Sequence, residues 1–87
     1  MALVQIPPVE AHVRWDRRAA RPTAVRWDGH QLRVIGLAAM RDETAAYPAA
    51  RGPRVTFVVD TADGGRAALA FDGARRRWYV EALEPAA

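Results

Sequence analysis

The fold of this chain is decided by the stretch PTAVRWDGHQLRV, residues 22–34. Apolar and polar residues alternate on both sides of Asp28-Gly29, which is the pattern of two strands joined by a tight turn. A two-residue type I′ turn needs a positive φ at both central positions, and Asp-Gly tolerates it. We therefore predict a β-hairpin with the cross-strand pairs Trp27 with His30, Arg26 with Gln31, Val25 with Leu32 and Thr23 with Val34.

A turn at Gly29-His30 is the alternative for this hairpin. It would keep the same faces but would set Arg26 directly opposite Arg33, and like charges in that position are destabilising. Turn chemistry and charge repulsion therefore both favour the turn at Asp28-Gly29.

The tetrapeptide Val-Arg-Trp-Asp occurs twice, at 13–16 and at 25–28. The first copy ends a run from Val9 in which apolar and polar residues alternate up to Trp15, and this pattern predicts a half-buried strand. The alternation of the third strand breaks at Gly36, which indicates a bulge or a sharp bend there.

The second half of the chain is typical of a three-stranded meander, within residues 55–59, 66–71 and 78–82. A three-residue turn after the first of these strands would set Asp60 opposite Arg66. A four-residue turn, Asp72 to Arg75, would then set Leu69 opposite Trp78 and Arg66 opposite Glu81. Opposite charges on the outer face support this register.

These elements predict an all-β fold, a small antiparallel twisted meander or an SH3-like or OB-like barrel of five to six short strands. Residues 39–53 are expected to form a long loop with at most marginal helix. We expect an N-terminal arm at 1–8, a single β domain at 9–84 and a tail at 85–87. The barrel interior would be filled by Trp15, Trp27, Phe57, Phe71 and Trp78.

Composition bounds the function without identifying it. The chain has 87 residues, a formal net charge of +3 and no cysteine, which indicates one domain and excludes disulfides and thiolate chemistry. All 13 basic residues are arginine; since a GC-rich genome produces the same bias, the basic charge alone is weak support for an anionic partner. The N-terminus lacks the features of a secretory signal, and no apolar run is long enough to span a membrane, so we expect a cytoplasmic protein with no membrane partner.

The sequence resembles a family of small all-β domains of unknown function from high-GC bacteria. The resemblance covers roughly residues 13–83 and is carried by the hairpin at 22–34, by VTFVV at 55–59, by LAFD at 69–72 and by WYVEAL at 78–83. Some members are appended to proteins resembling Y-family translesion polymerases. The resemblance therefore implies an accessory role beside such proteins, but it assigns no functional residue.

We expect no enzyme activity, no cofactor and no metal site. The chain has no Ser, Cys or Lys to serve as a nucleophile, and it has no phosphate-binding glycine loop. A metal site formed by His12, His30 and Asp28 is the alternative. The interpretation that we favour is that His30 packs its ring on Trp27.

Arginine lies on the outer face of nearly every predicted strand. The candidate nucleic-acid-binding residues are Arg14, Arg26, Arg33, Arg75, Arg76 and Arg77. The first three would lie on consecutive strands, with no carboxylate directly opposite Arg26 or Arg33. A guanidinium binds phosphate through two hydrogen bonds and stacks on bases.

The prediction is therefore a non-enzymatic binding module that contacts nucleic acid or a nucleic-acid-processing protein of the DNA-repair type. The alternative is a protein–protein interaction or self-assembly domain without nucleic-acid binding, which would use an exposed sheet edge and the apolar residues 3–6.

Overall fold

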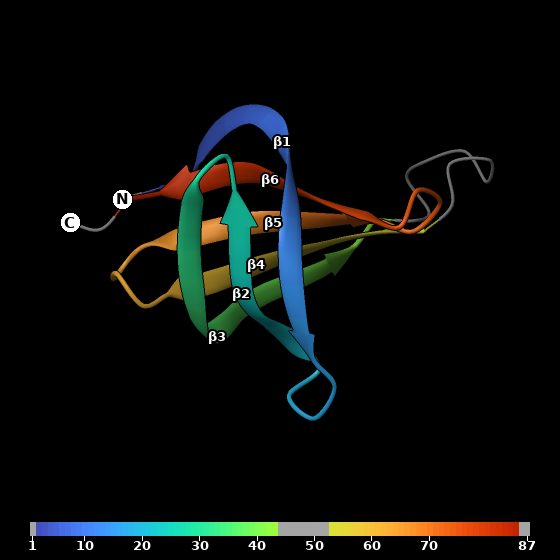
Figure 1. The fold of residues 1–87 in the computed structure, drawn as a ribbon, viewed down its shortest axis with the longest axis horizontal. Coiled ribbons are helices and arrows are strands. Elements are labelled where there is room, and N and C mark those ends of the chain that lie inside the picture. The colour runs from blue at the N-terminus through green and yellow to red at the C-terminus, as the bar shows by residue number, and fades with distance from the viewer. Residues whose placement is uncertain (1, 44–52, 86–87) are drawn as a thin grey trace.

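The computed structural model describes residues 2–43 and 53–85 and contains six strands (Figure 1). They are β1 (Val4–Asp16), β2 (Arg21–Trp27), β3 (His30–Asp42), β4 (Arg54–Thr61), β5 (Arg66–Asp72) and β6 (Arg77–Glu84). Each strand pairs antiparallel with the next, and β6 pairs with β1, so the sheet closes into a barrel. No helix occurs among the described residues. The prediction of a small all-β antiparallel barrel is confirmed.

The barrel consists of two layers that run crosswise (Figure 1). One layer contains β1, β2 and the first part of β3, and the other contains β4, β5 and β6 with the second part of β3. β1 and β3 have 13 residues each and take part in both layers. The pairing of β3 with β4 is irregular between Val34 and Gly36, which agrees with the bulge or bend predicted at Gly36, because a bulge bends its strand.

The hairpin between β2 and β3 has the predicted register. Trp27 pairs with His30, Arg26 with Gln31 and Val25 with Leu32. Asp28 and Gly29 have φ values of 45° and 78°, as a type I′ turn requires. The local chemistry of two residues therefore determines which side chains of the two strands lie opposite each other.

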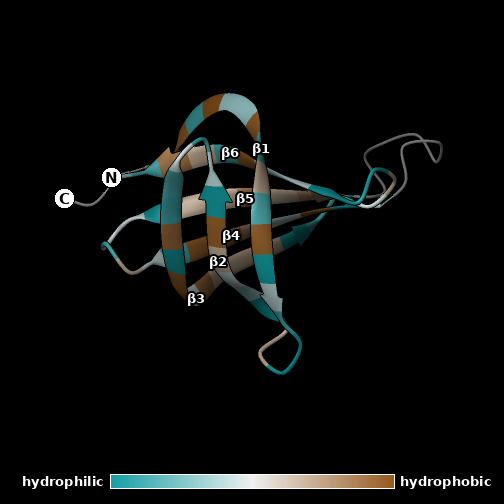
Figure 2. Ribbon diagram, in the orientation of Figure 1, coloured by the Kyte–Doolittle hydropathy of each residue, from teal (hydrophilic) through white to brown (hydrophobic). Residues whose placement is uncertain are grey.

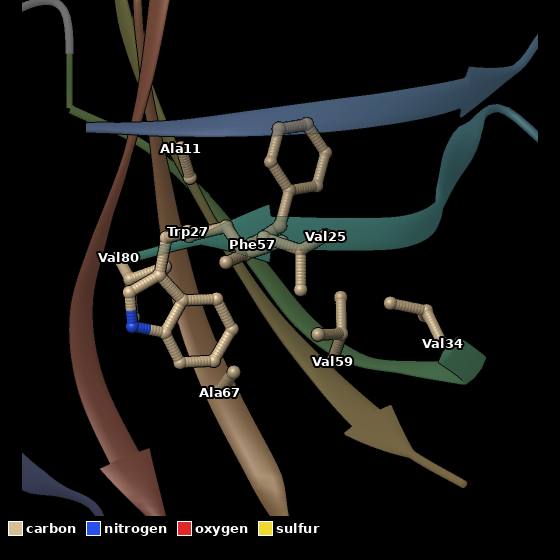
Figure 3. Packing of buried hydrophobic residues seen from close by; sticks show 9 residues of the cluster. Ala11, Val25, Trp27, Val34, Phe57, Val59, Ala67 and Val80 are labelled. Atoms are coloured by element: carbon tan, nitrogen blue, oxygen red, sulfur yellow. The ribbon is translucent and has the colours of Figure 1, made fainter. Parts of the chain in front are cut away.

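The core lies between the two layers (Figure 3). Val25, Val59, Leu69 and Val80 have no exposed surface, and Trp27 and Phe57 are also buried. Hydropathy alternates along β1, β2 and β3 (Figure 2), because one face of each strand packs inward and the other meets solvent. Trp27 lies in the interior as predicted, whereas Phe71 and Trp78 are only half-buried.

Trp15 does not lie in the interior, contrary to the prediction, because 42 % of its surface is exposed. The pairing of β1 with β2 shifts between Arg14 and Trp15, so simple alternation ends one residue before the indole. Trp15 also lies one residue before the end of β1, and its ring contacts those of Phe57 and Trp78 in the second layer while much of its surface stays exposed.

β1 begins at Val4, five positions before the strand that the alternation predicts from Val9. Val4 pairs with Leu83 and Gln5 pairs with Ala82. The pairing is interrupted between Gln5 and Val9, at two consecutive prolines that cannot donate to a ladder. The sequence pattern therefore does not predict the strand segment that begins at Val4, because pairing with β6, which is distant in the chain, stabilises it.

The loop predicted at 39–53 begins later in the structure. Residues 39–42 belong to β3, where Met40 pairs with Phe57. A second irregularity between Leu37 and Ala39 shifts the alternation again, which removes the period-two signal from this part of the strand. Residues 44–52, which make up most of the predicted loop, lie outside the described residues.

The predicted register of the last hairpin is wrong. Leu69 pairs with Val80 rather than with Trp78, and Arg66 pairs with Glu84 rather than with Glu81. The turn follows Asp72 rather than Phe71, which moves each cross-strand partner by two residues, and a bulge between Ala68 and Leu69 moves the partner of Arg66 by one more. A bulge of this kind leaves no periodic trace in the sequence.

The turn of this hairpin also lies one residue later than predicted. Asp72 stays in β5 opposite Arg77, and its carboxylate accepts hydrogen bonds from the backbone N–H groups of Ala74 and Arg75 at 3.1 and 3.2 Å. Gly73 packs so closely on Pro53 that a Cβ atom would overlap the proline ring. Asp72 therefore acts from the strand end as the cap of the turn.

The turn between β4 and β5 confirms the predicted pair of Asp60 and Arg66. Asp63 accepts hydrogen bonds from the Thr61 hydroxyl and, at 3.0 Å, from the backbone N–H of Gly65. The Thr61 hydrogen bond, followed by that of Gly65, lowers the pKa of Asp63 below its ordinary value, because both donors favour the charged carboxylate.

We predict that Gly29→Val lowers the free energy of unfolding by more than about 1 kcal/mol, since a β-branched residue at positive φ is strained. A Cβ at this position would meet no atom within 4 Å, so the backbone alone accounts for the loss. Asp28→Asn is the matched control, because asparagine tolerates positive φ. Urea unfolding measures both, and a wild-type midpoint for Gly29→Val would contradict the assignment.

We also predict a dependence of stability on pH at Asp63. The folded pKa is lowered, so the contribution of this group is complete above the pKa of the unfolded chain, about 4, and is lost as the pH falls through the folded pKa. Asp63→Asn should therefore reduce the loss of unfolding free energy on acidification below about pH 4. An identical pH profile for the variant and the wild type would refute this.

Candidate functional site, an arginine-rich outer face

The candidate site is the outer face of β1, β2 and the first part of β3. Two rows of directly opposed residues cross these strands: His12, Arg26 and Gln31 in one row, and Arg14, Ala24 and Arg33 in the other. Directly opposed side chains project to the same side of a sheet. We call the five polar members, His12, Arg14, Arg26, Gln31 and Arg33, the arginine face.

The face exists because of the register set at Asp28-Gly29. Val25 on β2 is fully buried and Leu32 opposite it packs against the core, so their neighbours Arg26 and Arg33 project outward. The turn at Gly29-His30 would leave both arginines on the outer face but directly opposite each other, whereas the observed register sets Arg26 opposite Gln31 and Arg33 opposite Ala24. The predicted grouping of Arg14, Arg26 and Arg33 on consecutive strands is therefore what the structure has.

The arginines of this face differ from other arginines in their electrostatic partners. Within residues 2–43 and 53–85, no carboxylate forms an ion pair with Arg14, Arg26 or Arg33. By contrast, Arg66 bonds Asp60 at 2.9 Å and Arg54 forms an ion pair with Glu81. The face thus carries positive charge that nearby carboxylates do not neutralise.

A shallow depression of about 410 Å³ lies on this face. Its lining includes His12, Arg14, Arg26 and Gln31, together with Ala24, which lies between Arg14 and Arg33 in the second row. The small alanine leaves room above the sheet, and the guanidinium groups around it can donate paired hydrogen bonds. This arrangement suits an anion such as a phosphate group.

The second predicted cluster, Arg75 to Arg77, does not lie on the arginine face, and two of its members have carboxylate partners. Arg77 donates to both carboxylate oxygens of Glu10, at 3.0 and 3.1 Å. Arg75 lies 4.0 Å from Asp72, and Arg76 occupies the turn between β5 and β6 with a φ of 54°. These residues belong to the turn-bearing end of the barrel.

The histidines do not form a site with the nearby carboxylate. The His30 ring lies 5.3 Å from the Trp27 ring at a tilt of 32°, which confirms that His30 packs on Trp27. No group of three or more His, Cys, Asp or Glu that could hold a metal ion occurs in the described part of the chain.

Sequence reasoning missed one exposed feature, the aromatic residues around Trp15. Its ring lies 5.5 Å from that of Phe57 and 6.1 Å from that of Trp78. The one sequence signal for exposure is position, since Trp15 is the last apolar residue before the polar run that begins at Asp16.

We predict that Arg26→Ala and Arg33→Ala each change the free energy of unfolding by less than about 0.5 kcal/mol, as for ordinary surface changes. Arg54→Ala should lower it by more, about 1–3 kcal/mol, because Glu81 would keep its half-buried charge without this partner. Denaturant unfolding of the three variants tests this. Equal losses in all three would show that the arginine face is structural.

No helix in the described residues is long and apolar enough to cross a membrane. A comparison with protein-family models, with curated proteins and with solved structures found no match to this chain. The family resemblance drawn from the hairpin and strand motifs therefore stays a prediction.

Proposed function

We propose that this chain is a non-enzymatic module that binds nucleic acid through the phosphate backbone, which lies on the arginine face. The observation that carries the proposal is the group Arg14, Arg26 and Arg33, which lies on three adjoining strands without carboxylate partners among the described residues. Repeated positive charge along one surface suits a ligand with repeated negative charge.

The chemistry of arginine supports a phosphate ligand in particular. Each guanidinium presents a planar fork of donors that matches two phosphate oxygens. His12 and Gln31 extend the same rows and can donate further hydrogen bonds to phosphate or sugar oxygens. Contacts of this kind position a nucleic acid without reading its sequence.

In this proposal the module is an accessory part of a nucleic-acid-processing system of the DNA-repair type, as the family resemblance implies. We propose that the module works in the cytoplasm. We propose no catalytic group, cofactor or metal ion in the module itself. Its role would then be to bring a strand or duplex to a partner protein that performs the reaction.

A protein-interaction function is the second candidate, and a specific observation favours it. Ile35 and Leu37 on β3 are 57 % and 39 % exposed, and β3 pairs with β2 only through residues 30–33. Beyond these residues β3 pairs with β4 on one side, and among the described residues no strand pairs with its other side, next to which Ile35 and Leu37 expose apolar surface. An exposed edge of this kind can pair with a strand of another chain.

Salt dependence distinguishes the two candidates. We predict that the wild-type protein binds fluorescent DNA and RNA oligonucleotides of about 15 residues, with an affinity that falls steeply as salt rises from about 50 to 200 mM. Arg26→Ala with Arg33→Ala should weaken binding and reduce the slope of log K against log salt by roughly 0.7–0.9 for each phosphate that the variant no longer neutralises. Fluorescence anisotropy measures both quantities.

Arg66→Ala is the matched control, since Arg66 is bonded to Asp60 and lies on β5. Its binding and its salt slope should stay close to those of the wild type. If the wild-type protein binds neither nucleic acid at about 50 mM salt, the proposal is wrong, and the protein-interaction function takes its place.

A further inference from the structure

Five apolar side chains enclose a hollow of about 330 Å³ beside β1. They are Trp15 from β1, Val55 and Phe57 from β4, Phe71 from β5 and Trp78 from β6. We call this the aromatic hollow. Four of its five residues are aromatic, so its walls consist largely of ring faces and edges. Contiguous apolar surface of this kind, where it is open to solvent, often marks a binding site.

The rings of the hollow form one continuous cluster. Trp78 is its centre, with ring centroids at 5.0 Å from Phe71, 5.5 Å from Phe57 and 6.1 Å from Trp15. Phe57 is buried, whereas Trp15 remains 42 % exposed. The cluster is therefore anchored in the core through Phe57 and exposes the indole of Trp15 to solvent.

The hollow adjoins the arginine face. Trp15 directly follows Arg14 in β1, so the two side chains lie within one residue of each other on either side of the same strand. β4, β5 and β6 continue beyond β1 toward the turn between β5 and β6 (Figure 1). A chain that lies on Arg14 can therefore turn around the strand and reach Trp15.

The surroundings of the hollow carry positive charge as well. Arg17 and Arg18 follow Trp15 in the loop after β1, and Arg75 and Arg76 lie in the turn between Phe71 and Trp78; all four are exposed. The charge complements a phosphate backbone on both sides of the hollow.

The two carboxylates closest in sequence to these arginines are turned to the backbone. Asp16 accepts hydrogen bonds from the N–H groups of Arg18 and Ala19 at 2.9 and 3.4 Å. Asp72 caps its own turn in the same way. These acids hold the two loops in place, and Asp72 also lies 4.0 Å from Arg75. Arg17, Arg18 and Arg76 form no ion pair within the described residues.

We propose that the aromatic hollow stacks unpaired bases of a single-stranded nucleic acid whose backbone lies on the arginine face. The inference rests on the proposed function and adds to it a preference for single strands. Aromatic side chains stack with any base, and a basic surface beside them follows the backbone. In a duplex the bases are stacked on one another, so they cannot enter the hollow without losing that stacking.

The experiment compares Trp15→Ala, Trp15→Phe and Val4→Ala in binding to fluorescein-labelled dT15, rU15 and a dA15·dT15 duplex at one salt concentration. Trp15→Phe keeps a ring for stacking and serves as the conservative variant. Val4 is 60 % exposed and lies at the other end of β1, so Val4→Ala controls for the loss of exposed apolar surface. Circular dichroism and urea unfolding verify that each variant is folded.

We expect the wild-type protein to bind dT15 and rU15 more tightly than the duplex. Trp15→Ala should lose roughly tenfold or more of its affinity for the single strands and less than about twofold for the duplex, which needs only the phosphate contacts. Trp15→Phe should retain most of the affinity, and Val4→Ala all of it. Tryptophan fluorescence should be quenched on binding of dT15 in the wild type, and quenched much less in Trp15→Phe.

Three results would overturn the inference. If Trp15→Ala binds single strands as the wild type does, while Arg26→Ala with Arg33→Ala weakens binding, the hollow takes no base and the proposed function still stands. If the wild type binds no oligonucleotide, the inference and the proposed function are both wrong. If sedimentation shows a wild-type dimer that Trp15→Ala converts to a monomer without loss of affinity, the hollow is occupied by a second copy of this chain.

Discussion

The pairing of β6 with β1 is the interaction on which the rest of the structure depends. It joins the first and last strands of the chain and closes the barrel, so these two strands do not have the free edges that they would have in an open meander. Because β1 lies between β6 and β2, its outer face adjoins both neighbours. The ion pair of Glu10 with Arg77 links it to β6, and the rows of the arginine face link it to β2 and β3.

Closure requires strands that bend, and the bends produce the two surfaces to which we assign function. β1 and β3 cross from one layer to the other through irregularities in their pairing, so the two layers run crosswise (Figure 1). A crosswise layer covers only part of the sheet behind it. The ends of β4, β5 and β6 extend past β1 (Figure 1), and the half-buried Phe71 and Trp78 line the hollow beside Trp15.

The arginines on the outer surface fall into two groups, those with a carboxylate partner and those without one in the described residues. Arg66 on β5 binds Asp60 on the neighbouring strand β4, and Arg54 on β4 reaches across β5 to Glu81 on β6. These pairs neutralise the arginine charge there. Arg26 and Arg33 have no such partner in the described residues. The same residue type therefore stabilises the fold on β4 and β5 and leaves charge available to a ligand on β2 and β3.

The sequence by itself determined what depends on neighbours in the chain. Turn chemistry at Asp28-Gly29 and strict alternation on both sides established the first hairpin, its buried valine and its outward arginines, because a type I′ turn admits one register. The all-β class followed from six short alternating runs. The candidate arginine face was predictable in the same way, since it needs only the register of adjoining strands.

Only the tertiary structure decided what depends on distant partners. Residues 4–8 and 39–42 became strand through pairing with β6 and β4, where prolines and bulges erase the periodic signal in the sequence. The turn after Asp72, where Gly73 packs on Pro53, and the bulge between Ala68 and Leu69 set the last register, and Trp15 remained partly exposed near the end of β1. The physical reason is the same in each case: backbone pairing between remote segments can stabilise a local irregularity, and neither that pairing nor its geometry is encoded by the residues next to it.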